Sequence, residues 1–398
     1  MKFDFEKFHQ ELLDTGMHPT RAKEMVKQFR QDIHDWPEIY ADWEQCEQLL
    51  KMGFIPGHKM LFGEDFNENT YQCYYPDFEY FMAHPVNNHF NIWINDKLTL
   101  KYMLNTPELS KYMPEYYLYI ENDGHYSYLM DAPEDIPKDR HFVFNLLAKY
   151  KRLAAKPSRG SGGRGFLDLR YTDGRITAND AVIEQSDFED FIRRECNGYL
   201  FTQFIEQSSE MEEVFEGTDC ALRIVLYKKA MKNYYDPASY GCLIAYARFG
   251  TAKSNHASNL CHGGLAVRVN WETGRYEGGF RGNTEFWGQR GAAGFERHPD
   301  TGEAIDGKQI PHWDSVREGL LKICRYMSSL DFFGMDVIIT QDDFMLCEIN
   351  SAPSTGLGQF HQGKCCLDTE DAREFAARKR RPWKKSLVEC FKDCVIEY

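Results

Sequence analysis

The sequence predicts a mixed α+β protein with a helical N-terminal region. Residues 4–52 place apolar side chains at helical spacing, with a break at Met17-His18-Pro19-Thr20, where Thr20 is expected to cap the next helix. Later segments alternate apolar and polar residues around turn signals such as Asn122-Asp123-Gly124, which is typical of strands joined in hairpins. A chain of 398 residues is long enough for two or three compact lobes.

The other elements follow from local patterns in chain order. Residues 53–95 are mixed and rich in aromatic side chains, and Asp96 is expected to cap a helix that carries Lys97 and Lys101. Further on, we expect strands at 116–120 and 126–130, a helix at 139–150, a strand around Lys156, a short helix capped by Ser186, strands at 199–205, 221–227, 242–248 and 265–270, a long loop at 275–310 and a helix at 316–328.

Residues 332–350 predict a β-hairpin with a polar face. Two apolar runs flank Gln341-Asp342-Asp343, and a three-residue loop there would set Asp336 opposite Glu348. Asn350 would share the face of Glu348, because side chains alternate along a strand. Carboxylates are costly in an apolar hairpin unless a cation holds them, and hard oxygen ligands suit Mg²⁺. The alternative is a half-solvated hairpin with an ordinary polar face.

Residues 153–166 join a lysine strand to a glycine-rich loop, Lys156-Pro157-Ser158-Arg159-Gly160-Ser161-Gly162-Gly163-Arg164-Gly165. Glycines let backbone amides approach phosphate closely, and the lysine adds a positive charge. The loop matches G-x-G-x-x-G, but a strand follows it instead of the helix that a dinucleotide site needs. Walker and protein-kinase motifs do not fit either. A phosphate-binding hairpin and a flexible surface hairpin are the two interpretations.

With these two segments in this order, the chain resembles the ATP-grasp superfamily, which includes the D-alanine–D-alanine ligases. Between them, Arg248-Phe249-Gly250, Gly263-Gly264-Leu265-Ala266-Val267 and His298-Pro299-Asp300-Thr301-Gly302 resemble the sugar-transfer-associated ATP-grasp subgroup. The resemblance covers roughly residues 90–360. It implies a nucleotide cleft between two α+β lobes: a helical and mixed region at 1–95, a small lobe with the glycine-rich hairpin at 96–200, a large lobe with the metal hairpin at 201–365, and a basic tail at 366–398.

The resemblance also implies residues that bind ATP and metal. Lys97 and Lys156 would neutralise phosphates, which the backbone of Ser161, Gly162 and Gly163 would cover. Gln203, Phe204, Ile205 and Glu206 would hold adenine and ribose, although Phe204 and Ile205 fit a plain strand core equally well. Asp336, Glu348 and Asn350 would hold one or two Mg²⁺ (or Mn²⁺) ions.

One residue that binds the acid substrate in the related ligases has no counterpart at the same position of this chain, so other residues are expected to take its role. The related ligases have an arginine two residues before the metal aspartate, where this chain has Gly334. Arg223 and Arg248 are the expected replacements and would hold the reaction intermediate, with a surface ion pair as the alternative role. Asn259 and His262 are expected to contact the acceptor.

The implied reaction is ATP-dependent joining of a carboxylate and an amine. The γ-phosphoryl group would move to the carboxylate, and the amine would displace phosphate from the acylphosphate. The implied substrates are small or saccharide-linked carboxylates and amines, used in polysaccharide or cell-surface biosynthesis. A small-molecule kinase on the same fold, and a nucleotide-binding regulatory protein without turnover, are the alternatives.

Composition favours a soluble cytoplasmic enzyme. The net charge of −14 argues against non-specific binding to nucleic acid. The N-terminus carries charges where a signal peptide has an apolar run, and no segment has the roughly 18 apolar residues of a transmembrane helix. The 12 scattered cysteines predict reduced thiols and fit no standard zinc site. The basic run 373–385 predicts a solvated helix face, with contact to an anionic substrate or a membrane surface as the alternative.

Overall fold

The structure is a computed structural model that describes residues 2–160, 163–216, 220–231, 233, 235, 237–254, 258–287 and 293–397. The chain divides into two compact units, which are described separately. The first consists of Met1–Asn91, Glu213–Met335 and Asn350–Tyr398, and the second of Ile92–Glu212 and Asp336–Ile349. Helices and sheets occur in both, which confirms the α+β class. Within the described residues, no helix is both long and apolar enough to span a lipid bilayer.

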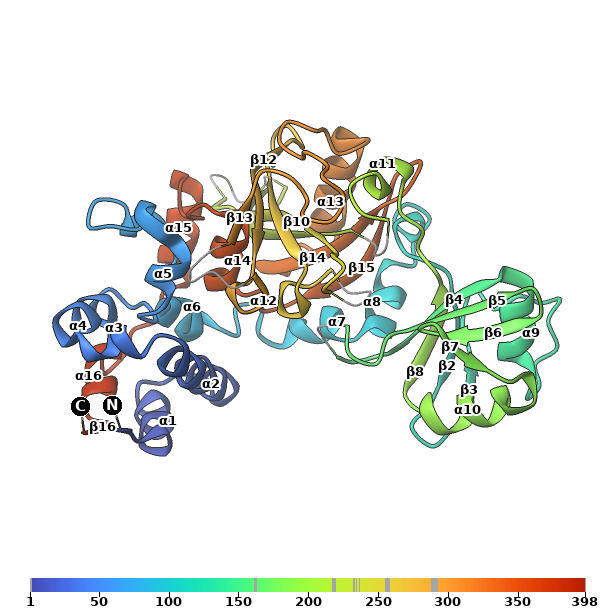
Figure 1. The fold of residues 1–398 in the computed structure, drawn as a ribbon, viewed down its shortest axis with the longest axis horizontal. Helices are drawn as coiled ribbons and strands as arrows, with labels where there is room; N and C mark the ends of the chain where they lie inside the picture. Colours follow the sequence, from blue (N-terminus) through green and yellow to red (C-terminus); the bar gives the residue numbers. More distant parts are fainter. Residues whose placement is uncertain are drawn as a thin grey trace. The chain divides into compact units, whose positions relative to one another are not determined.

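Helices from both ends of the chain form one layer of the first unit. They are α1 (Phe5–Asp14), α2 (Pro19–Asp35), α3 (Pro37–Ala41), α4 (Trp43–Lys51), α5 (His58–Phe62), α6 (Asp77–Ala83), α15 (Glu370–Lys379) and α16 (Leu387–Lys392). The short strand β1 (Lys2–Phe3) pairs with β16 (Val395–Glu397), so the two ends of the chain meet (Figure 1). The predicted helical N-terminal region is confirmed, and the C-terminal residues complete it.

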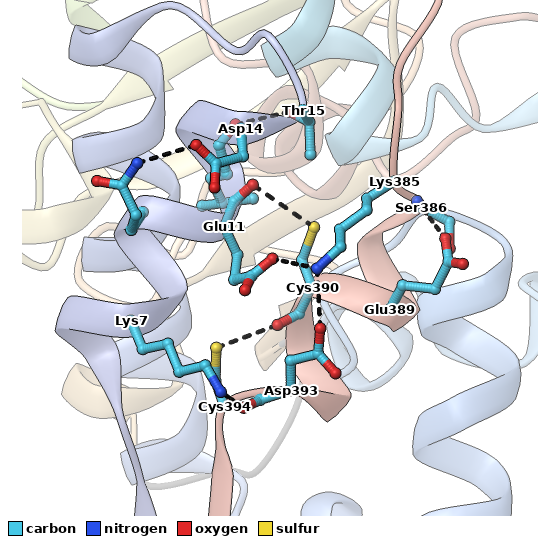
Figure 2. Close-up of polar contacts among 12 residues, drawn as sticks. Lys7, Glu11, Asp14, Thr15, Lys385, Ser386, Glu389, Cys390, Asp393 and Cys394 are labelled. Carbon is cyan, nitrogen blue, oxygen red and sulfur yellow. Dashed lines mark hydrogen bonds and ion pairs between the residues drawn. The ribbon is translucent and has the colours of Figure 1, made fainter.

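Phe391 on α16 is the centre of this helical layer. Its ring lies 4.5 Å from Phe3 and 6.0 Å from Phe8, centroid to centroid, and it is fully buried. Figure 2 shows polar contacts between α1 and the C-terminal segment: the ammonium of Lys385 lies 2.5 Å from Glu11 and 2.9 Å from Asp393. Burial of several phenylalanines therefore joins the first and last helices into one core.

The basic run near the C-terminus makes contacts within the first unit while several of its side chains stay exposed. Arg378 donates to the Lys228 carbonyl at 2.8 Å, and Lys379 forms an ion pair with Asp331. Further along, Arg380 lies 3.1 Å from Glu79, and Arg381 donates to the carbonyl of Pro85 at 3.3 Å. Arg378 and Arg380 are exposed, as a solvated face requires, and all four residues also have partners within the first unit.

One seven-stranded sheet has the strand order β13-β12-β11-β10-β9-β14-β15. Its strands are β9 (Ala221–Lys228), β10 (Tyr240–Phe249), β11 (Leu265–Val269), β12 (Tyr276–Gly282), β13 (Ala293–Phe295), β14 (Phe332–Ile339) and β15 (Phe344–Asn350). The helices of this region are α12 (Thr284–Trp287), α13 (Trp313–Tyr326) and α14 (Thr355–Gln362). One face carries apolar side chains with no exposed surface, among them Leu222, Ala247 and Val267.

The predicted loop at 275–310 is wrong in its first part, where β12 and β13 extend the sheet. Gly278 and Gly279 adopt left-handed backbone angles, φ +83° and +67°, and the β11–β12 register shifts between Val267 and Arg268. This bulge breaks the alternation by which a strand is recognised. Phe280 is nevertheless fully buried, so β12 contributes to the core.

The second unit contains another seven-stranded sheet, of order β3-β2-β8-β4-β5-β6-β7. Its strands are β2 (Tyr116–Ile120), β3 (Tyr126–Tyr128), β4 (Arg152–Pro157), β5 (Leu167–Thr172), β6 (Arg175–Ala178), β7 (Ala181–Ile183) and β8 (Tyr199–Gln203). Its helices are α7 (Ile92–Asn95), α8 (Lys97–Leu104), α9 (Phe142–Tyr150), α10 (Phe188–Glu195) and α11 (Ser209–Glu212). Apolar residues of α9 and α10 pack on the sheet and form the core of this unit.

Local predictions in the second unit are largely confirmed. Asp96 caps α8 by accepting from the backbone N–H of Thr99 at 2.9 Å, and β4 and β5 pair across the glycine-rich loop. Two predicted caps are wrong. Thr20 lies inside α2, because Pro19 starts that helix with a suitable fixed φ. Ser186 precedes α10, whose N-cap is Asp187.

Candidate active site

Lys97 connects the glycine-rich loop with the predicted metal hairpin inside the second unit. It is the first residue of α8, and its backbone N–H donates to the Ser158 carbonyl at 3.0 Å. Its ammonium lies 3.3 Å from the carboxylate of Glu348 and 3.2 Å from the carbonyl of Gly160. Three segments that are distant in the sequence therefore meet at one cation.

Lys156 is partly buried near the same carboxylate. Burial lowers the pKa of Lys156 and the charge of Lys97 lowers it further, against the opposite effects of Cys347 and Glu348. Its ammonium lies 5.9 Å from the centre of the Tyr116 ring, within cation–π range. Lys97 and Lys156 thus lie near the same carboxylate, that of Glu348.

The glycine-rich loop requires glycine at its ends. Gly160 has φ +142° and Gly165 has φ +77°, and a Cβ at Gly165 would lie 2.7 Å from the Tyr199 hydroxyl. Ser161 and Gly162, two predicted phosphate contacts, lie outside the described residues, whereas Gly163 is described with φ +72°. The backbone of the described part thus has the glycine-specific shape that close approach to a ligand uses.

The predicted adenine strand ends earlier than expected. β8 stops at Gln203, whose side-chain oxygen accepts from the Glu115 backbone N–H at 3.2 Å. Phe204 and Ile205 follow the strand and are nearly buried, whereas Glu206 is exposed. The guanidinium of Arg152 lies 3.4 Å from the centre of the Phe204 ring. An arginine thus contacts the Phe204 ring, so the adenine-binding roles of these residues stay predictions.

The metal hairpin has a tighter turn than predicted. The backbone N–H of Thr340 donates to the Asp343 carbonyl at 3.0 Å, which leaves Gln341 and Asp342 as a two-residue turn. In an unbroken register this turn would set Asp336 opposite Cys347, and a one-residue bulge is needed to restore Glu348 to that position. The alternation of buried and partly exposed side chains along β15 is interrupted here, because the neighbours Cys347 and Glu348 are both partly exposed.

The hairpin residues fit a hard cation by their chemistry. Asp336 is only 5% exposed on a strand that is otherwise apolar and buried, and Glu348 and Asn350 lie two residues apart on β15. Two carboxylates and an amide oxygen are the ligand types that Mg²⁺ prefers. Among the described residues, no three His, Cys, Asp or Glu side chains gather as a metal site. The predicted set has only two side chains of these types, so its metal role stays a prediction.

Arg223 lies beside Gly334, the position at which the related ligases have an arginine, and both residues belong to the first unit. A Cβ at Gly334 would lie 3.4 Å from the Cδ of Arg223 and 2.7 Å from Pro353. Arg248, nearly buried on β10, donates to the Asn259 side chain at 2.8 Å. His262, by contrast, is exposed in the short helical turn that follows. The structure therefore brings Arg248 and Asn259 together and puts Arg223 beside Gly334.

Three further residues near these sites were missed by sequence reasoning. Tyr116 has a buried hydroxyl without a hydrogen-bond partner among the described residues. Cys347 influences the pKa of Lys156, and His361 on α14 is influenced by Arg248 and Arg223. Tyr116 and Cys347 were part of correctly predicted strands, so their positions relative to Lys156 were the missing information. His361 carried no signal beyond its proximity to two cysteines.

The comparisons with known proteins give the family. The description "sugar-transfer associated ATP-grasp" belongs to the family whose sequence model matches residues 82–372. This match spans well over half of the chain, so the protein belongs to that ATP-grasp family, as the motifs predicted. No curated protein matches the chain.

Several solved structures resemble the chain at low identity. The ATP-grasp ligase PsnB, complexed with a minimal precursor, is 12% identical with a TM-score of 0.35, over 73% of this chain and 62% of that chain. D-alanyl-alanine synthetase A from Vibrio cholerae O1 biovar eltor str. N16961 is 10% identical with a TM-score of 0.37, over 76% and 66%. Biotin carboxylase from Campylobacter jejuni is 8% identical with a TM-score of 0.37, over 72% and 46%. The chain thus spans about three fifths of the length of PsnB.

Proposed function

We propose that the protein is an ATP- and Mg²⁺-dependent carboxylate–amine ligase that acts through an acylphosphate. Its substrates are small or saccharide-linked carboxylates and amines of polysaccharide or cell-surface biosynthesis. The observation that carries the proposal is the meeting of Lys97 and Lys156 beside Glu348 in one compact unit. Membership of the ATP-grasp family supports it further.

The two lysines bind and orient the ATP phosphates. Each ammonium is a compact point charge, and both lie near the carboxylate of Glu348. Charge therefore accumulates at the terminal phosphates, so the γ-phosphoryl group is the one that transfers. Asp336, Glu348 and Asn350 would hold Mg²⁺, which when bound neutralises charge on the phosphate oxygens.

The arginines act on the acid substrate. Arg223, beside Gly334, and Arg248, fixed by Asn259, present guanidinium forks that suit carboxylate and phosphate oxygens. They hold the carboxylate for attack and the acylphosphate that results. The amine then attacks the acyl carbon, and phosphate leaves. Most of the rate enhancement comes from position and charge, since no nucleophilic side chain is needed.

The fate of the ATP phosphate tests the proposal. Incubation with ATP, Mg²⁺, hydroxylamine and a panel of carboxylic acids should give ADP, free phosphate and a hydroxamate with at least one acid, because an acylphosphate is attacked by any good amine. The control variant Glu348→Gln should give none of these products. AMP and pyrophosphate would contradict the mechanism.

The same experiment addresses a kinase. A stable phosphorylated hydroxyl product, with no hydroxamate from any acid tried, would replace the ligase by an ATP-dependent small-molecule kinase. Arg223→Ala and Arg248→Ala separate the two steps further. In a ligase, each variant should slow hydroxamate formation more than it weakens ATP binding.

A further inference from the structure

Lys101 on α8 is a charged side chain that is almost completely buried in the second unit. Its side chain is 3% exposed, and its ammonium lies 2.8 Å from the carboxylate of Asp131 and donates to the Pro114 carbonyl at 2.9 Å. The same ammonium lies 5.3 Å from the centre of the Tyr116 ring. A lysine ammonium has three N–H donors, so two oxygen acceptors and one aromatic ring account for all of them.

Asp131 is in turn fixed to strand β2. Its carboxylate accepts from the backbone N–H of Tyr116 at 2.7 Å, and its own N–H donates to the Tyr116 carbonyl at 3.2 Å. The ion pair of Lys101 with Asp131 therefore joins helix α8 to strand β2. Because the removal of charges from water is costly, such a pair is kept in place by its close partners.

The same helix carries Lys97, one turn before Lys101. Residues four positions apart are neighbours on one side of a helix. The side chain of Lys97 is 13% exposed, and its ammonium lies beside Glu348. The donors of Lys101 are engaged inside the unit, whereas Lys97 lies at the candidate nucleotide site. Lys101 is therefore suited to hold the helix, and Lys97 to contact the ligand.

Tyr116 extends this arrangement to the second candidate nucleotide lysine. The ammonium of Lys156 lies 5.9 Å from the centre of the Tyr116 ring, so the ring is within cation–π range of both Lys101 and Lys156. The strand that fixes Asp131 through its backbone thus contacts Lys156 through a side chain. β2 is the element to which both lysines are related.

We propose that Lys101 is a positioning residue, whose ion pair with Asp131 holds α8 on β2 and thereby sets the place at which Lys97 presents its ammonium to the ATP phosphates. The proposal rests on the proposed function in one respect, because only a nucleotide site gives Lys97 phosphates to bind. An ordinary buried ion pair would contribute to stability alone, and its removal would not depend on whether Lys97 is present.

Calorimetry with Mg²⁺ and a non-hydrolysable ATP analogue tests the link to Lys97. The double variant Lys101→Met, Asp131→Asn removes both charges together, so no unpaired buried charge remains to prevent folding. This double variant should raise Kd by about three- to tenfold. In a Lys97→Ala background the same two changes should raise Kd by less than about twofold, because they act through an ammonium that is already absent.

Hydrogen exchange of the protein without nucleotide tests whether the ion pair holds α8. In the double variant, the backbone amides of α8 should exchange at least about tenfold faster than in the wild type, and those of α9 should stay within about twofold. The matched control is Lys149→Met with Asp135→Asn, which removes an exposed ion pair with the same 2.8 Å distance from the same unit. This control should leave both exchange and Kd unchanged.

The two measurements separate the role of Lys101 from the proposed function. Equal acceleration of exchange in α8 and α9 would make the ion pair a general contributor to stability and overturn the proposal. The same rise in Kd with and without Lys97 would also overturn it, and ATP binding by the wild type would then leave the nucleotide site standing. A wild-type protein that binds no ATP analogue would refute the nucleotide site, while faster exchange confined to α8 would still support the role of Lys101 in holding the helix.

Discussion

Removal of the Lys156 ammonium should weaken ATP binding by about ten- to a hundredfold. A hydrogen bond to a charged group contributes about 1.5–3 kcal/mol, which corresponds to that range in Kd. The loss should not be complete, because Lys97 remains 3.3 Å from Glu348 and still faces the phosphates in our assignment. The measurement is calorimetry with Mg²⁺ and a non-hydrolysable ATP analogue on Lys156→Ala.

Two companion variants make this result specific. Lys156→Arg should recover only part of the affinity, because the larger guanidinium must fit between the Tyr116 ring and the charge of Lys97. Lys149→Ala removes an exposed lysine of α9 that pairs with Asp135, and this variant should bind the ATP analogue as the wild type does. Wild-type affinity in Lys156→Ala would refute the assignment of this lysine to the nucleotide.

Three other predictions concern the metal, the loop and the core. Glu348→Gln should reduce ATP turnover by several orders of magnitude at an unchanged melting temperature, and a much lower melting temperature with turnover retained would make Glu348 structural. Gly165→Ala should lower the free energy of unfolding by about 1–3 kcal/mol more than Gly174→Ala does. Both glycines have φ near +78°, but only a Cβ at Gly165 would lie close to another side chain, 2.7 Å from the Tyr199 hydroxyl. Equal losses of the two variants in thermal unfolding would contradict this prediction. Burial lowers the pKa of His84 to about 4, so as the pH falls the unfolded chain binds a proton at this residue before the folded protein does. The free energy of unfolding should therefore fall by up to about 1.4 kcal/mol per pH unit between pH 6.5 and pH 4. Chemical denaturation of His84→Phe should show a smaller decrease over the same pH range.

Elements with a local cause could be predicted from the sequence. The cap of α8 needs only Asp96 and the N–H of Thr99, and the hairpin that carries Lys156 needs only alternation and glycines. The candidate lysines and carboxylates were singled out because their residue types are chemically unusual in such surroundings. The proximity of Lys97 and Lys156 to Glu348 was implied by family resemblance and not by any pattern in the chain.

Features that depend on distant partners could not be predicted. The composition of the basic run predicts its exposed side chains but not their partners: Lys379 pairs with Asp331, 48 residues away, and Arg380 pairs with Glu79 near the other end of the chain. A bulge hid β12, since its two left-handed glycines remove the alternation that identifies a strand. His361 contacts Tyr246 only because α14 packs against β10, and neither the type of these residues nor their spacing predicts that packing.

The pairing of the chain's two ends has a consequence for folding during synthesis. The first helices leave the ribosome early, yet the core that they enclose requires Phe391. At about 5–20 residues per second, the wait between Phe8 and Phe391 is about 20–80 s. Throughout that time Phe8 can contact Phe29 of α2 but lacks its contact with Phe391, so nascent chains should recruit chaperones at their N-terminal helices.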